Sequence, residues 1–182
     1  SLGVGNLGTT DARASLRASN GSMRYQFSAN SYDTDNHRNN FGNRERNVMG
    51  RATWSEGSTL VSVQLANQAT TGGLPGGLTA NDFDQDPKKT YKPNDNGKTE
   101  SNNLLLSAEM PISDWHLVGD FNRKLLQVES NQYVDMFFSK NNTVFNRSGV
   151  RVWKEFSADD LKHRFLLGLD NEQWEQNQSS NY

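Results

Sequence analysis

The ionisable side chains of this sequence do not form an obvious catalytic constellation. Glu109 and Asp120 are candidates for a pair of catalytic carboxylates, and His116 could act as a base beside Asp120. Both roles need a pocket that excludes water. The alternating polar pattern around these residues instead predicts a wet surface, so we expect no catalytic residues and no enzymatic activity.

Metal and cofactor chemistry also lacks its ligands. The chain has no cysteine, and its three histidines, His37, His116 and His163, are far apart, so the sequence predicts no metal site. The stretches 81–86 and 94–97 offer oxygen ligands but do not complete a calcium-binding loop. The glycines of 72–77 lack the lysine-serine pair of a phosphate loop. We expect no cofactor.

Composition excludes other classes of function. A net charge of -2, from 19 basic and 21 acidic residues, predicts no nucleic-acid partner. Only 33% of the 182 residues are hydrophobic, which is little for a soluble globular domain. No apolar run is long enough for a transmembrane helix, and 1–10 lacks a signal-peptide pattern.

Apolar and polar residues alternate along eight segments, which predicts eight strands. The first two are joined by Asn20-Gly21, a dipeptide typical of tight hairpin turns, and the pattern of strand, short turn and strand returns three times. One face would be apolar, with Leu16, Phe27, Trp54, Val63, Leu106, Leu117 and Leu167. The other would be polar, with Arg17, Gln26, Arg51, Gln64 and Asn122.

The connections between these strands alternate in length. Short turns are predicted near 20–22, 56–58, 111–114 and 157–160, and long loops at 32–46, 69–100 and 127–142. This alternation is typical of outer-membrane barrels. We therefore predict an all-β fold: one partial domain, 1–182, of an antiparallel up-and-down transmembrane β-barrel, with about eight strands as four hairpins of a larger barrel.

The loop sequences resemble those of a known family. Asp35-Asn36-His37-Arg38-Asn39-Asn40 follows a strand that ends in small, aromatic and acidic residues, and 43–47 leads into the returning strand. Gly73-Leu74-Pro75-Gly76-Gly77-Leu78-Thr79 is followed by Asp82-Phe83 and Asp86-Pro87. In order and spacing these motifs resemble the early barrel of TonB-dependent outer-membrane receptors, and 3–8 resembles their first outer loop.

The resemblance implies a transporter in the outer membrane of a Gram-negative bacterium. Its barrel would have about 22 strands and a plug domain, and it would import a scarce nutrient such as a ferric siderophore or another metal chelate, using energy delivered by TonB. Outer-membrane lipid, the small-molecule substrate, the plug and TonB are the implied partners. This chain would supply about a third of the wall, without the plug.

Ligand-binding residues are expected in the outer loops, because binding residues concentrate on loops held by a rigid scaffold. The candidates are Arg38, Arg44, Leu74, Pro75, Tyr91, Tyr133 and Phe137. For the apolar cluster of Tyr133, Met136, Phe137 and Phe138, packing under neighbouring loops is the other interpretation.

Two alternatives remain open at this point. The first is a soluble all-β binding module, for instance a carbohydrate-binding sandwich, whose apolar face would be buried inside the molecule. The second is a self-contained eight-stranded outer-membrane barrel, with 172–182 running past its last strand. An open sheet would leave unpaired backbone groups at its edges, so we expect the isolated chain to self-associate or to need partners that supply strands.

Overall fold

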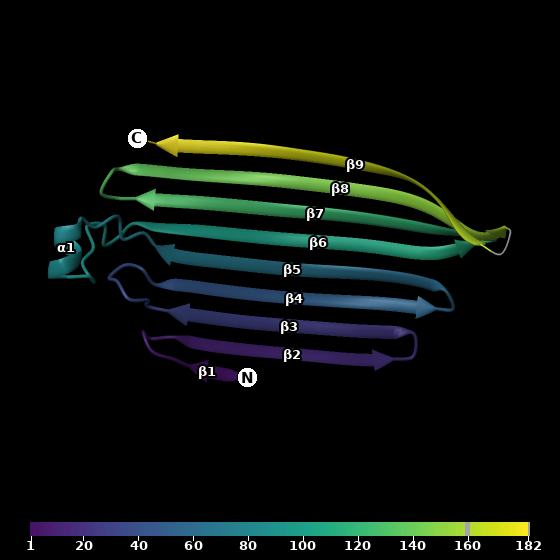
Figure 1. Cartoon of the computed structure of the whole chain (residues 1–182), viewed down its shortest axis with the longest axis horizontal. Coiled ribbons are helices and arrows are strands. Elements are labelled where there is room, and N and C mark those ends of the chain that lie inside the picture. Colours follow the sequence, from purple (N-terminus) through teal and green to yellow (C-terminus); the bar gives the residue numbers. More distant parts are fainter. Residues whose placement is uncertain (159–160, 182) are drawn as a thin grey trace.

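The computed structural model describes residues 1–158 and 161–181, which form a single layer of nine antiparallel strands (Figure 1). Strand order follows chain order, so each strand pairs with the strand before it. No helix among the described residues has the length and apolarity needed to cross a membrane. The elements are β1 (Leu2–Val4), β2 (Thr10–Asn20), β3 (Met23–Thr34), β4 (Asn43–Glu56), β5 (Thr59–Gly73), α1 (Ala80–Gln85), β6 (Asn96–Ile112), β7 (Trp115–Gln132), β8 (Phe137–Ala158) and β9 (Leu161–Asn181).

The short and long connections lie at opposite ends of the sheet, which we call the turn end and the loop end (Figure 1). At the turn end, Gly21 and Gly57 adopt positive φ angles of 55° and 56°, a conformation that tight hairpin turns need and that glycine adopts without steric cost. The loop end carries 35–42, 74–95 with α1, and 133–136. Predicted turns near 20–22, 56–58 and 111–114 coincide with strand junctions, whereas 159 and 160 of the fourth lie outside the described residues.

The backbone pairing assigns every strand residue to one of two faces. Leu16 pairs with Phe27, Phe27 with Gly50, Gly50 with Leu65 and Leu65 with Leu104, and directly opposed residues share a face. Because the register continues without a break to β9, the predicted face assignment is confirmed. We call the side of Leu16 the apolar face and the side of Arg17 the polar face.

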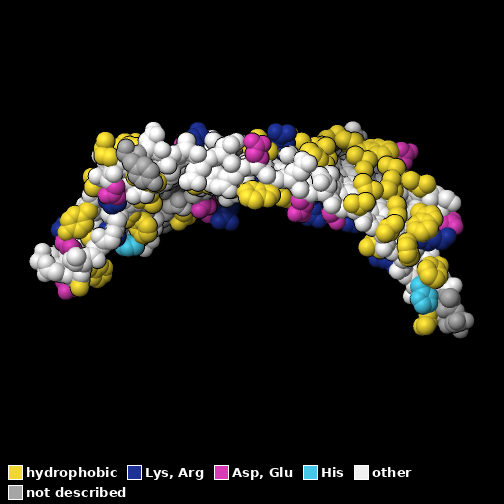
Figure 2. Space-filling view, turned by 90° about the horizontal axis from the view of Figure 1, so that it is seen from above, with side chains coloured by type: hydrophobic (Ala, Val, Ile, Leu, Met, Phe, Trp, Pro, Cys, Tyr) yellow, Lys and Arg dark blue, Asp and Glu magenta, His cyan; other side chains and the backbone are white. Residues whose placement is uncertain are grey.

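The described part of the sheet has no buried apolar core. None of the described Ala, Val, Ile, Leu, Met, Phe, Trp or Tyr side chains is buried, and Leu65 and Leu167 remain about 60% and 62% exposed. Figure 2 shows hydrophobic side chains gathered densely toward the turn end of an arched molecule. A soluble sandwich would bury this face against a second sheet, so that interpretation is wrong for this chain.

The second alternative, a small closed barrel, is also wrong. Within the described residues β1 and β9 are the two outermost strands and do not pair with each other (Figure 1), so the sheet is open. β9 continues without interruption to Asn181, where the small-barrel interpretation placed a tail after the last strand.

The strands extend further toward the loop end than predicted. β7 and β8 cover most of 127–142 and leave a connection of 133–136. The predicted loops 32–46 and 69–100 shorten to 35–42 and 74–95, and part of 3–8 forms the extra strand β1. The added strand residues are mostly polar on both faces, so backbone pairing extends where the apolar signal has ended.

Candidate functional site

The loop 74–95 is organised around the carboxylate of Asp82. This side chain accepts hydrogen bonds from the Thr79 hydroxyl at 2.6 Å, the Tyr91 hydroxyl at 2.6 Å and the Lys89 ammonium at 2.7 Å. Thr79 caps α1 by accepting the Asp82 backbone N–H. The Lys89 ammonium also lies 4.6 Å from the centroid of the Tyr91 ring. Two segments of one loop, the start of α1 and residues 89–91, therefore meet at a single carboxylate.

These contacts shift the pKa values of Asp82 and Lys89. The hydrogen bond from Lys89, then those from Thr79 and Tyr91, hold the pKa of Asp82 well below its usual range. The bond to Asp82 is also the main cause that raises the pKa of Lys89 above that of a free lysine. Both groups stay charged at neutral pH, so Asp82 is suited to holding the loop and not to accepting protons.

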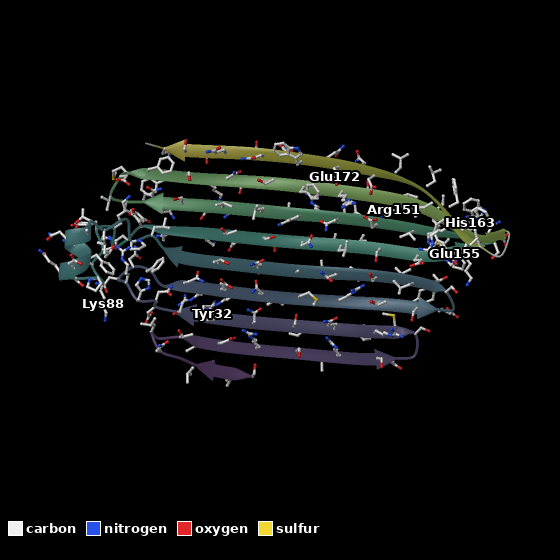
Figure 3. All side chains as sticks on the ribbon, viewed as in Figure 1. Tyr32, Lys88, Arg151, Glu155, His163 and Glu172 are labelled. Atoms are coloured by element: carbon white, nitrogen blue, oxygen red, sulfur yellow. The ribbon has the colours of Figure 1, made fainter. Side chains whose placement is uncertain are left out.

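Arg38 connects the loop 35–42 to the loop 74–95. Its two terminal nitrogens donate to the carbonyls of Gly76 at 2.9 Å and Lys89 at 3.0 Å. Beside it, the backbone N–H of Asn39 donates to the carbonyl of Lys88 at 3.0 Å; Figure 3 labels Lys88 at the loop end. Arg38, a predicted ligand-binding residue, is thus a connector between loops, and its two terminal nitrogens are occupied by backbone carbonyls.

Asp95 joins all three loops. Its side chain is fully buried, and Oδ1 accepts the backbone N–H groups of Tyr133 at 2.7 Å and Val134 at 3.3 Å. Its backbone carbonyl accepts the Asn40 side-chain amide at 2.8 Å and the Leu74 N–H at 2.9 Å. A buried carboxylate that accepts backbone N–H groups is a strong tie. We call the loops 35–42, 74–95 and 133–136, joined in this way, the loop cluster.

The other predicted ligand-binding residues have different positions. Pro75 is buried, and its carbonyl accepts the Thr90 hydroxyl at 3.0 Å. Leu74, Tyr91 and Tyr133 belong to the loop cluster and are 38%, 50% and 49% exposed. Phe137 starts β8, where it pairs with Gln132.

Arg44 does not join this group. It lies on the apolar face and forms an ion pair with Asp33 of β3. The sequence carried the signal for this position, because Arg44 is in phase with Val48 on the same strand.

Sequence reasoning missed Asp82 and Asp95, although one signal was present for the first. Thr79 and Asp82 have the spacing of a helix-capping motif. Asp95 has no comparable local signature. Among the described residues no group of histidine and acidic side chains is arranged to hold a metal ion. Each of the two acidic stretches considered for calcium instead contributes one carboxylate to the loop cluster, Asp82 and Asp95.

The catalytic candidates are held in structural contacts. Asp120 accepts a hydrogen bond from Arg151 at 2.8 Å, and the ring of His116 is stacked on Trp153 with centroids 3.8 Å apart. Glu109 lies 3.9 Å from the His116 ring. The structure therefore does not bring His116 and Asp120 together as a base and its partner.

A charge network crosses the polar face on β7, β8 and β9. Arg151 bridges Asp120 and Asp170, at 2.8 and 2.6 Å, and Arg147 lies 3.5 Å from Glu172 and 3.4 Å from Asp170. Figure 3 labels Arg151 and Glu172 on the neighbouring strands. Five charged groups thus neutralise one another almost completely. Exposed ion pairs add little stability. The network therefore suits the surface of a wall that faces water or a polar filling, where it lowers the net charge of that surface.

Comparison with solved structures identifies the fold of this chain. No family model matches the chain, and no curated relative does. Solved structures do match. A pyoverdine-bound FpvA of Pseudomonas aeruginosa has a TM-score of 0.81 at 11% identity and covers 100% of this chain. BauA, the ferric preacinetobactin receptor of Acinetobacter baumannii, reaches 0.80 at 10% identity over 97%. The alcaligin outer-membrane receptor FauA of Bordetella pertussis reaches 0.73 at 14% identity over 95%.

At these identities the likeness shows that the fold is shared. The chain spans 28% of the FpvA chain, 30% of BauA and 26% of FauA. Its nine described strands therefore have the arrangement of one sector of a large receptor barrel.

Proposed function

We propose that this chain is part of the barrel wall of a TonB-dependent outer-membrane receptor that imports a ferric siderophore or another scarce metal chelate. The observation that carries the proposal is the exposed apolar face on an open sheet. Its apolar side chains form a continuous band from β2 to β9, and no described element covers them. Such a face is stable when it contacts lipid.

The position of the loops supports a receptor role. All three long connections of the described strands lie at one end, which in barrels of this type is the outer surface. They are joined by Asp95 and Arg38 into one body. Rigid loops lose little conformational freedom when a ligand binds, which favours affinity.

The loop cluster also presents side chains suited to contact. Phe83, Val134 and Met136 are 57%, 55% and 65% exposed, alongside Tyr91 and Tyr133. We propose that ligand recognition uses this apolar and aromatic surface, with Leu74 and Phe137 beside it. Transport and not catalysis is the proposed role, in keeping with the similar solved structures, which include two receptors and the ferric citrate transporter FecA.

Open strands at both edges imply neighbours. In the full-length protein we propose that further strands of the same barrel pair with β9 and with the exposed edge of β2. The chain alone would self-associate through these edges, because unpaired backbone groups in lipid cost several kcal/mol each.

The experiment is a growth assay on single iron sources. The gene for the full-length protein is deleted, and growth is measured with individual ferric siderophores in iron-limited medium. The proposal predicts lost growth on one chelate, restored by the intact gene. Deleting 74–78 should reduce uptake while the protein still migrates as a folded barrel before heating. Unchanged growth and uptake on every chelate would contradict the import role.

A further inference from the structure

Three arginines on the polar face have no anionic partner among the described residues. Arg17, Arg24 and Arg51, here the arginine cluster, lie on β2, β3 and β4 near the turn end and are exposed. Gln26 pairs with both Arg17 and Arg51, so these two arginines belong to one row across the sheet. All three side chains line one open hollow of about 660 Å³.

The other arginines of the polar face are paired. Arg13 binds Asp11 at 2.6 Å, Arg151 binds Asp120 and Asp170, and Arg147 approaches Asp170 and Glu172. Arg164 forms an ion pair with Glu155. The arginines of the polar face are therefore paired over β7 to β9, whereas three of them stand without an anionic partner at the turn end of β2 to β4.

We propose that the arginine cluster is the docking surface for an acidic segment of a domain that lies inside the barrel. A guanidinium matches a carboxylate in a paired geometry. Neighbouring strands are about 4.8 Å apart, and β3 lies between β2 and β4, so the Cα atoms of Arg17 and Arg51 are separated by roughly 10 Å. That spacing fits two carboxylates of one protein segment better than one small anion.

Desolvation gives the reason why the partner must be acidic. A domain that fills the lumen removes water from the sheet beneath it, and a charge left unpaired there is strongly destabilising. The filling therefore has to supply anionic groups over the turn end of β2 to β4, whereas the arginines of β7 to β9 already have partners. The cluster also lies at the turn end, away from the loops through which a ligand would enter.

This inference rests on the proposed function, because the polar face is an interior surface only in a closed barrel. Its test uses the full-length protein in detergent, with any other cysteine replaced. Gln26→Cys places a single thiol between Arg17 and Arg51, and Ser19→Cys gives a second reporter beside Arg24. The rate of maleimide labelling is measured with rising sodium chloride and with added inorganic phosphate.

The proposal predicts slow labelling at low salt and faster labelling as salt screens the ion pairs. Arg17→Glu with Arg51→Glu should raise the labelling rate at least about tenfold, as expected when one side of a buried charge pair is lost. Arg46→Glu, on the same strand as Arg51 but on the apolar face, is the matched control and should leave the rate unchanged.

Three results would overturn the proposal. Rapid labelling of the unmodified arginine background would show that nothing covers the cluster. Protection that survives high salt and the double substitution would show that charge does not hold the partner. Protection that appears only with phosphate would identify a small-anion site. If the protein instead forms no barrel with heat-dependent migration, the proposed function fails, and this outcome is distinguishable from the other three.

Discussion

The fully buried carboxylate of Asp95 accepts the backbone N–H of Tyr133 at 2.7 Å and so joins two loops that are 38 residues apart in sequence. The same residue holds Asn40 through its backbone carbonyl. The side chain of Asp95 therefore ties 133–136 to 74–95, and it can be removed without changing a strand residue.

Asp95→Ala should loosen the loop cluster and leave the sheet intact. The substitution removes the acceptor of the Tyr133 and Val134 N–H groups, and each unsatisfied buried donor costs about 1–3 kcal/mol. Hydrogen exchange should accelerate at 133–136 and 74–95. Asp84→Ala, an exposed position in α1, is the control. Equal exchange in the two variants would contradict the role of Asp95.

Arg38→Ala should loosen the attachment of the loop 35–42 to the loop 74–95, because the Gly76 and Lys89 carbonyls lose their donors while the bonds of Asn39 and Asn40 remain. Arg38→Lys should recover only part of the effect, since one ammonium cannot reproduce two donors in a planar fork. Protease cleavage within 35–42 reports the separation. If Arg38→Ala abolishes ligand binding while cleavage is unchanged, Arg38 contacts the ligand directly instead.

Acid should release the Asp82 contacts. Because the pKa of Asp82 is lowered in the folded protein, its contribution is complete above the usual aspartate value of about 4 and is lost as pH falls toward the folded value. The Lys89 contribution, with a raised pKa, is present at neutral pH and is lost only in strong alkali.

The measurement compares the wild type with Asp82→Asn. At pH 8, trypsin should cut faster after Lys88 and Lys89 in the variant. The difference in hydrogen exchange between the two proteins should narrow as pH falls below about 4, because the carboxyl of the opened loop then binds a proton and the closed loop loses its advantage. A difference that stays constant from pH 7 to pH 2 would be inconsistent with this role.

Gly149→Ala should destabilise the barrel. A β-carbon at this position would lie 2.6 Å from Asp170 Oδ1 and 3.0 Å from Asp120 Oδ1, so the ion pairs with Arg151 must shift. Displacing these partly exposed ion pairs costs up to about 1 kcal/mol. Gly50→Ala is the control, because nothing lies within 4 Å of its added carbon. The urea midpoint for loss of heat-dependent migration should fall only for Gly149→Ala, and adding Asp170→Ala should restore it.

The faces and the hairpins were predictable because alternation has a period of two and the paired strands keep one register. On β5, for example, the apolar face is indicated by Val61, Val63 and Leu65, because polar residues stand between them. The parts of β7, β8 and β9 near the loop end were not predicted, because amides such as Asn141, Asn142 and Gln176 occupy both faces there and carry no apolar signal. The ties of Asp95 depend on contacts between distant loops, which no local pattern encodes.

We propose that one face of the sheet contacts lipid and that the other lines an interior. Spin labels along β5 test this proposal most directly. Single cysteines at 61, 63 and 65 and at 64, 66 and 68 of the full-length protein are labelled in lipid bilayers. Accessibility to oxygen, which concentrates in lipid, and to a water-soluble nickel complex is then measured. We expect high oxygen accessibility at 61, 63 and 65 and low values at the other three positions. Equal accessibility at all six positions, or the opposite phase, would contradict it.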